Sequence, residues 1–178
     1  SLFSSPHVKF VEGGVNADIG GGKYDFVTEW FAARGIRNFI FDPFNRTREH
    51  NLSSVNNVAG GKADTATVSN VLNVIAEPEA RSKVIAQAAD AIKADGEAYF
   101  TVHRESGKAA GETRQGYQLH RFPQDYITEI EKHFGKVERK PGGILVASQP
   151  IKQGSAADTL NQANRGAIEF SNIILWKR

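Results

Sequence analysis

The sequence contains no cysteine, and this absence removes several kinds of chemistry at once. Without a thiol the chain forms no disulfide bond, offers no thiolate nucleophile and builds no cysteine-based metal site. The remaining ligand types, histidine and the acidic residues, do not cluster with metal-ligand spacing. We therefore expect no metal centre.

Long apolar runs are absent too. No stretch is long enough to span a bilayer, and no segment has the pattern of a secretory signal peptide. We therefore expect a cytoplasmic protein without a membrane partner. The formal net charge is only +2, with a pI of about 8.9, and this mildly basic balance permits an anionic partner without requiring one.

What the sequence does contain is an alternation of strand-like and helix-like segments. The apolar patterns predict strands at 15–19, 36–44 and 97–103, and a further strand in the first part of 64–74. They predict helices at 23–34, 78–92 and 125–134. Residues 136–148 are predicted to form a strand–turn–strand hairpin. Residues 45–63 are polar and favour a short helix or an irregular segment over a strand.

This order of elements predicts an α/β fold of the Rossmann-like, doubly wound type. We expect a mostly parallel sheet with helices on both faces and an antiparallel C-terminal hairpin. Residues 1–150 form the predicted domain. Residues 151–178 follow as a C-terminal extension whose apolar stretch, GAIEFSNIILWKR, we expect to pack on the same domain or on a partner subunit in a homodimer.

Three consecutive glycines, Gly20, Gly21 and Gly22, follow the first predicted strand. Glycine loses the most backbone freedom on folding, so a triple glycine is destabilising unless the backbone must be bare there. In a doubly wound sheet such a turn presents N–H groups to a ligand beyond the strand ends. The alternative is a merely tight strand-to-helix turn. Asp42, at the end of the second strand, is placed to bind ribose hydroxyls, or to cap a turn together with Pro43.

The turn does not complete the dinucleotide fingerprint G-x-G-x-x-G, because Asp25 stands where the third glycine belongs. An acid at that helix N-terminus would repel a pyrophosphate. The pattern therefore favours a ligand that has ribose and adenine but no phosphate.

Two motifs resemble those of the class I S-adenosylmethionine-dependent methyltransferases. The run Asp18-Ile-Gly-Gly-Gly22 resembles the acid-x-Gly-x-Gly motif of that family, and Asp42 matches the acid that ends its second strand. DTATVSNVLNV at 64–74 resembles the family's D-x-V-x-x-x-x-V-L-x-x-V motif, and the order and spacing of the motifs extend the resemblance over residues 15–148.

The resemblance implies a Rossmann-like enzyme that uses S-adenosylmethionine as cofactor and holds a nucleophile in line with its methyl group. It places at the cofactor the residues Asp18, Gly20, Gly21, Gly22, Asp42, Pro43, Ser69 and Asn70. Asn70 has the alternative of a local hydrogen bond at a strand end. Tyr24 replaces a third glycine that is common in the family, and 45–63 matches its third strand poorly. These departures leave open a non-catalytic S-adenosylmethionine-binding or interaction module.

Residues 104–121 lack periodicity and carry three glycines, as is typical of a lid, a binding loop or a disordered segment. His103, His120 and Tyr117 border or lie within this segment and are the catalytic candidates. As a lid, the segment closes over cofactor and substrate, with His103 or His120 as a base. The alternative is a solvated surface.

The residues also narrow the methyl acceptor. Methylation at C5 of a pyrimidine by the covalent route needs a cysteine, which the chain lacks. Enzymes that methylate base amino groups carry a D/N/S-P-P-Y/F-like motif where this chain reads SNVL, at 69–72. The SNVL sequence therefore disfavours a base amino group without removing it from the candidates. The expected partner is an unidentified acceptor, either nucleic acid or a small molecule.

Overall fold

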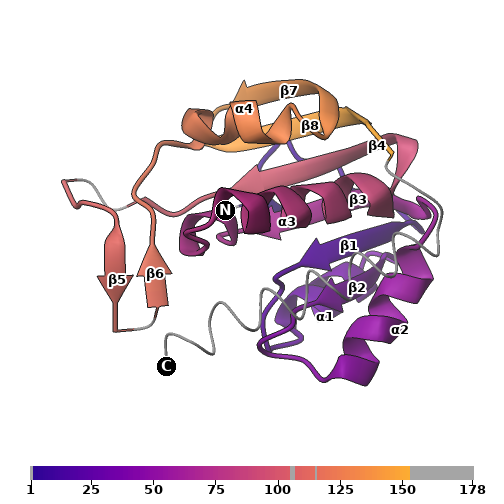
Figure 1. The fold of residues 1–178 in the computed structure, drawn as a ribbon. Helices are drawn as coiled ribbons and strands as arrows, with labels where there is room; N and C mark the ends of the chain where they lie inside the picture. The colour runs from indigo at the N-terminus through magenta and orange to yellow at the C-terminus, as the bar shows by residue number, and fades with distance from the viewer. Residues whose placement is uncertain (1, 105–106, 115, 153–178) are drawn as a thin grey trace.

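A six-stranded sheet forms the centre of the molecule (Figure 1). The computed structural model describes residues 2–104, 107–114 and 116–152, so the predicted packing of the C-terminal extension lies outside the described residues apart from its first two. The strands follow one another across the sheet in the order β2 (Arg37–Phe41), β1 (Val15–Ile19), β3 (Ala63–Ser69), β4 (Ile92–Thr101), β8 (Ile144–Pro150) and β7 (Phe134–Lys140).

The pairing of the strands confirms the predicted fold class. The first four strands of that order are parallel, whereas β8 runs antiparallel to β4 and pairs with β7 in an antiparallel hairpin. The chain leaves β1 outward to β2 and then returns across β1 to β3. The strand order therefore reverses at β1, and the carboxyl ends of β1, β2 and β3 meet at this switch point.

Helices cover both faces of the sheet, as predicted. On one face α2 (Arg48–Val58), α3 (Pro78–Ala91) and α4 (Ile127–Ile130) share a core with every second residue of β1. On the other face α1 (Phe26–Ala32) packs against the N-terminal segment, where the rings of Phe3 and Phe10 contact Phe31 at centroid distances of 5.8 and 4.7 Å. Because β1 is covered on both faces, all five of its residues are buried.

Strand β4 begins at Ile92, five residues before the predicted start at 97, and strand β2 ends at Phe41 and not at 44. Three further segments differ from the prediction. The strand that begins 64–74 ends at Ser69, and the short 3-10 helix η2 (Leu72–Val74) follows it. The predicted helix at 125–134 is divided into η3 (Pro123–Tyr126) and α4, because the chain enters it through Pro123 in a tighter 3-10 turn. Residues 104–121 are not without structure: β5 (Gly111–Thr113) and β6 (Gly116–Gln118) form a small hairpin. Strands of three residues are too short to leave a period in the sequence.

The polar segment 45–63 contains α2 and no strand, in agreement with the sequence-based expectation. Thr47 begins the helix by accepting a hydrogen bond from the backbone N–H of His50 at 3.2 Å, the usual way in which a threonine side chain caps a helix. Since the chain returns from α2 directly into β3, no described strand pairs with the outer side of β2, which is an edge of the sheet.

Candidate cofactor site

The carboxyl edge of the sheet gathers the predicted cofactor residues. Ile19 pairs with both Phe41 and Val68 in the parallel register, so the residues that follow the three strands emerge side by side. The backbone N–H of Gly20 donates to the carbonyl oxygen of Phe41 at 2.7 Å and fixes the glycine turn against the end of β2. The turn, Asp42 and the Ser69–Asn70 pair therefore share one edge.

The backbone of the turn explains its glycines. Gly20 and Gly22 have φ of 75° and 79°, the left-handed region that glycine adopts most easily. A Cβ at Gly20 would lie 2.4 Å from Cγ2 of Val71, and one at Gly21 would lie 2.5 Å from Oδ2 of Asp18. Beside Gly22 no atom lies within 4 Å of a Cβ position. Gly20 and Gly21 are thus required because a side chain would collide with its neighbours, whereas the space beside Gly22 is open.

Asp18 lies beneath the turn and not on its surface. Its side chain is buried on the α1 face, where Oδ1 accepts a hydrogen bond from the Thr67 hydroxyl at 2.9 Å. Burial raises the pKa of this carboxyl to about 6, against the hydrogen bonds from Thr67 and Asn38 that lower it. This position suits a residue that supports the turn from below, and a direct contact of Asp18 with a cofactor stays a prediction.

Asp42 has its hydrogen-bonding capacity filled by the protein. Oδ1 accepts from the backbone N–H groups of Phe44 and Asn45, both at 3.0 Å. Oδ2 accepts from the N–H of Gly22 at 2.8 Å and from the side-chain amide of Asn45 at 3.1 Å. A carboxylate has about four acceptor positions, so Asp42 caps the turn after Pro43, the alternative that the sequence left open. A ribose must therefore displace a donor, and Asn45, which is exposed, is the easiest to move.

Two residues of the polar segment complete the edge, although the sequence did not single them out. The Asn51 side chain accepts from the N–H of Asp42 at 2.8 Å and donates to its carbonyl oxygen at 3.1 Å. The Arg46 guanidinium donates to the carbonyl oxygens of Gly22 and Tyr24 at 2.8 and 3.1 Å and pairs with Asp25 at 2.8 Å. The only sequence feature that could have indicated their role is the group of hydrogen-bonding side chains directly after Asp42-Pro43, where the second strand ends.

Ser69 and Asn70 end β3 at the same edge. Asn70 has φ of 58°, a left-handed conformation that asparagine tolerates better than most residues. Its backbone N–H donates to the carbonyl oxygen of Thr101 at 2.9 Å, and the Ser69 hydroxyl lies 3.0 Å from that of Thr101. The exposed side chain of Asn70 is therefore held at the edge by its backbone.

The three catalytic candidates lie along the connection from β4 through the β5–β6 hairpin. His103 follows β4 and is exposed, whereas Tyr117 on β6 and His120 after it are half-buried. The connection after the hairpin is joined to η2, the 3-10 helix that follows β3, because the N–H of Leu119 donates to the carbonyl oxygen of Asn73 at 2.6 Å. The β5–β6 hairpin lies on the side of the sheet where the chain leaves β4 (Figure 1), and a catalytic role of the three residues stays a prediction.

Aromatic side chains are unusually exposed around this edge. Tyr24 and Phe26 are 59% and 71% exposed, and their rings lie 5.6 Å apart just after the glycine turn. In the segments that follow β4 and β6, the Arg104 guanidinium lies 3.8 Å from the ring centre of Phe122, which is 47% exposed. Exposed flat rings are suited to contact a planar ligand.

The described part of the chain offers no metal centre and no membrane segment. Within residues 2–104, 107–114 and 116–152, no three histidine, cysteine or acidic side chains come together as a metal site. Among the helices of those same residues, none has both the length and the apolar character needed to cross a bilayer.

Solved structures with the same fold are S-adenosylmethionine-dependent methyltransferases. A methyltransferase from Methanosarcina mazei matches with a TM-score of 0.56 and 12% identity over 81% of this chain and 95% of that one. The 1,6-didemethyltoxoflavin-N1-methyltransferase of Burkholderia thailandensis, solved with S-adenosylhomocysteine, matches with a TM-score of 0.54 and 20% identity over 79% and 72%. The methyltransferase SibL matches with a TM-score of 0.52 and 15% identity over 78% and 51%.

These similarities identify the fold as that of the class I methyltransferases and confirm the resemblance seen in the motifs. No model of a protein family matches the sequence, and no curated protein does. The chain spans only about half the length of SibL.

Proposed function

We propose that the chain binds S-adenosylmethionine at the carboxyl edge of β1, β2 and β3 and transfers its methyl group to an acceptor. One observation carries the proposal: the glycine turn, Asp42 and the Ser69–Asn70 pair converge where the strand order of a methyltransferase fold reverses. Ligands of doubly wound sheets bind at such a point.

The residues present fit such a cofactor. Open space beside Gly22 leaves room for a ligand against the bare backbone of the turn. Asp42 faces the same turn through Oδ2, and ribose hydroxyls would take the position of the Asn45 side-chain amide. Phe44 and Asn45 would keep Oδ1 in place through their backbone N–H groups, so the carboxylate is already oriented before the ligand binds.

The chemistry needs little from the protein beyond positioning. When bound, the cofactor supplies a methyl group on a sulfonium, which is already a strong electrophile. The acceptor's nucleophilic atom forms a bond to that methyl carbon as the carbon–sulfur bond breaks, which leaves S-adenosylhomocysteine. Where the nucleophile carries a proton, we propose His103, His120 or Tyr117 as the base that receives it. The β5–β6 hairpin would exclude water by closing over the edge.

Label transfer tests the proposal. Purified protein is incubated with methyl-labelled S-adenosylmethionine and, separately, with DNA, RNA and a small-molecule extract. We expect label in one of the three fractions, which would identify the acceptor class. With His120 as the base, His120→Asn lowers the transfer rate by about 10²-fold or more, whereas His7→Asn, in the N-terminal segment, leaves it unchanged.

Failure of label transfer and failure of cofactor binding lead to different conclusions. If S-adenosylhomocysteine binds but no fraction is ever labelled, catalysis is wrong and the chain is the non-catalytic cofactor-binding module. The tyrosine at position 24, where the family commonly has a glycine, and the poor match of 45–63 are the observations that favour this second candidate. If the cofactor does not bind at all, both candidates fail.

A further inference from the structure

Arg104 is a half-buried cation with which no carboxylate of the described residues pairs. Its guanidinium lies 3.8 Å from the ring centre of Phe122. Stacking on an aromatic face holds the guanidinium in one plane and leaves its N–H groups at the edge of that plane. Of these donors, the Nε–H is shielded from solvent and has no hydrogen-bond partner in the part of the chain that the structure describes.

The other partly buried arginines of residues 2–104, 107–114 and 116–152 all pair with a carboxylate. Arg46 has an ion pair at 2.8 Å, and Arg81 and Arg121 share Glu129 at 2.7 and 3.3 Å. A buried donor without a partner is costly, and more so when the group is charged. The protein keeps this cost only at the stacked arginine, as expected of a group whose partner is a ligand.

The chain holds Arg104 close to the proposed cofactor edge. Strand β4 ends at Thr101, whose carbonyl oxygen accepts from the N–H of Asn70 at 2.9 Å. Arg104 follows three residues later, a span of at most about 11 Å. The side-chain amide of Gln118 on β6 holds the segment between them by donating to the carbonyl oxygen of His103 at 3.2 Å. A small acceptor bound by the guanidinium can therefore reach the carboxyl edge of the sheet.

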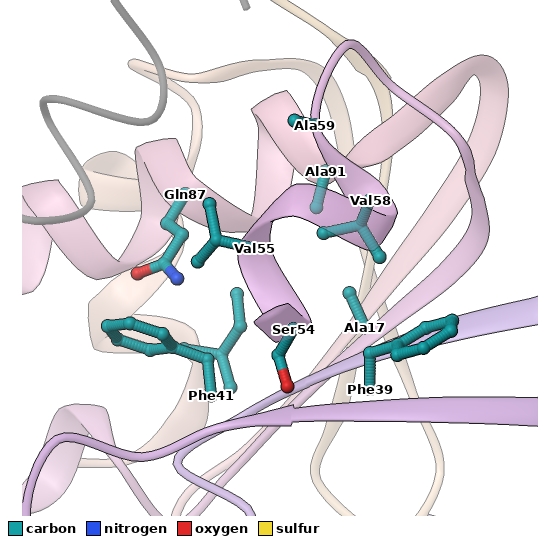
Figure 2. A pocket seen from close by; sticks show the side chains of 10 residues that line it. Ala17, Phe39, Phe41, Ser54, Val55, Val58, Ala59, Gln87 and Ala91 are labelled. Atoms are coloured by element: carbon teal, nitrogen blue, oxygen red, sulfur yellow. The ribbon is translucent and has the colours of Figure 1, made fainter. Parts of the chain in front are cut away.

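The surrounding charges favour an anionic ligand. Next to Phe122 in the chain, Arg121 shares its carboxylate partner with Arg81, so positive charge is in excess on this side of the sheet. The hollow between β2, α2 and α3 differs, because Figure 2 shows it surrounded mainly by apolar side chains and no residue that lines it is charged. An anion there would lose its water without gaining a partner.

The burial of the guanidinium selects the kind of anion. Nucleic acid backbones are bound by exposed cations spread along a surface, whereas the Nε–H of Arg104 is shielded from solvent. A guanidinium held in one plane binds a carboxylate through two parallel N–H···O bonds. A single carboxylate on a small molecule therefore fits this position better than a chain of phosphates.

We propose that Arg104 binds a carboxylate of the methyl acceptor, and that the acceptor is a small carboxylic acid. The proposal rests on the methyltransferase function and narrows its acceptor class. Arg104 would bind and orient the acceptor, while Phe122 keeps the guanidinium in its plane.

Binding of two matched probes tests the carboxylate site without a reaction. para-Fluorobenzoate carries a carboxylate on a small ring, and para-fluorobenzamide is its neutral counterpart. Each probe is titrated with the protein in the presence of S-adenosylhomocysteine, and binding is followed by fluorine NMR line broadening. We expect the native chain to bind the benzoate at least about tenfold more tightly than the benzamide, and Arg104→Gln to abolish this preference.

Arg34 supplies a matched control. Its guanidinium lies 3.7 Å from the ring centre of Trp30, but it is exposed and donates to the carbonyl oxygen of Trp30 at 2.9 Å. Arg34→Gln should therefore leave both probe affinities unchanged. Equal binding of the two probes by the native chain, or a preference for the benzoate that persists in Arg104→Gln, overturns the proposal. Circular dichroism of each variant confirms that folded proteins are compared.

Two further readings separate this proposal from the methyltransferase function. S-adenosylhomocysteine also carries a carboxylate, so a loss of its affinity in Arg104→Gln would place the cofactor at this arginine and overturn the proposal. Transfer of label to nucleic acid or to a neutral small molecule would overturn it as well, although the methyltransferase function would stand. If the native chain does not bind S-adenosylhomocysteine, the methyltransferase function itself fails.

Discussion

At the scale of single residues, the site depends on the three glycines, which leave the backbone of the turn without side chains, and on Asp42, whose carboxylate is held by four hydrogen bonds. Gly20 and Gly21 are glycines because side chains there would collide with Val71 and Asp18, whereas Gly22 faces open space. Asp42 has the role of a cap in the protein as it stands, and a ribose that binds it must displace one of its donors, most easily the Asn45 side chain. Three of the four donors come from Phe44 and Asn45, next to Asp42 in the chain, as the turn-cap alternative allowed. The fourth, the N–H of Gly22, is brought there by the fold and could not be predicted from the sequence.

Asp18 makes stability depend on pH in a direction opposite to that of an ordinary paired carboxylate. Its pKa is about 6 in the folded protein and 3.8 when unperturbed, so the folded state binds the proton more tightly than the unfolded state. As pH rises from about 4 to 7, the free energy of unfolding should therefore fall by about 2 kcal/mol relative to an Asp18→Asn variant.

Urea denaturation of both proteins across this pH range measures the difference. Asp18→Asn keeps an oxygen that accepts from the Thr67 hydroxyl, and the asparagine side chain does not titrate. The difference in stability between the two proteins therefore contains the titration of Asp18 alone, because all other groups titrate in both. A constant difference between the two proteins would show that Asp18 has the same pKa in the folded and unfolded states, so that burial does not raise it.

At the scale of elements, the predictable parts are those with a period. Strands β1, β2 and β4 and helices α1 and α3 have apolar patterns that burial imposes, and the sequence identified each of them. Arg46 and Asn51, which complete the edge, have no such pattern, because their polar side chains bind backbone groups of Gly22 and Asp42. The β5–β6 hairpin was missed for a different reason, since three residues per strand are too few to alternate.

The packing of α3 against α4 rests on a buried ion pair. Arg81, 1% exposed, binds both carboxylate oxygens of Glu129 at 2.7 and 2.8 Å and donates to the carbonyl oxygens of Ile75 and Ala76. Removing one partner leaves the other charge without compensation. We expect Glu129→Gln to reduce the free energy of unfolding by about 3 kcal/mol, measured by urea denaturation.

A surface ion pair supplies the matched control. Glu138 pairs with Lys136 and Lys140 on β7, where both partners are largely solvated, so Glu138→Gln should leave stability unchanged. Equal effects of the two substitutions would mean that the Arg81–Glu129 pair does not hold α4 in place.

At the scale of the whole molecule, the sheet order and the switch point follow from the alternation of elements. The return from β2 through α2 directly to β3 leaves β2 as an edge of the sheet. The sequence indicated this connection only through the polar character of 45–63.

The central claim is that the bare backbone at the carboxyl edge binds the cofactor, and two glycines allow a matched test. Gly22 and Gly13 have φ of 79° and 72°, and neither has an atom within 4 Å of a Cβ position. Alanine therefore introduces similar backbone strain at both, but only Gly22 lies at the proposed site.

Isothermal titration with S-adenosylhomocysteine, on the native chain and both variants, is the most direct measurement. We expect saturable binding by the native chain, a loss of at least about tenfold in affinity for Gly22→Ala, equivalent to about 1.4 kcal/mol, and no change for Gly13→Ala. Absence of binding by the folded native chain, or equal losses in the two variants, would contradict the assignment of this edge as the cofactor site.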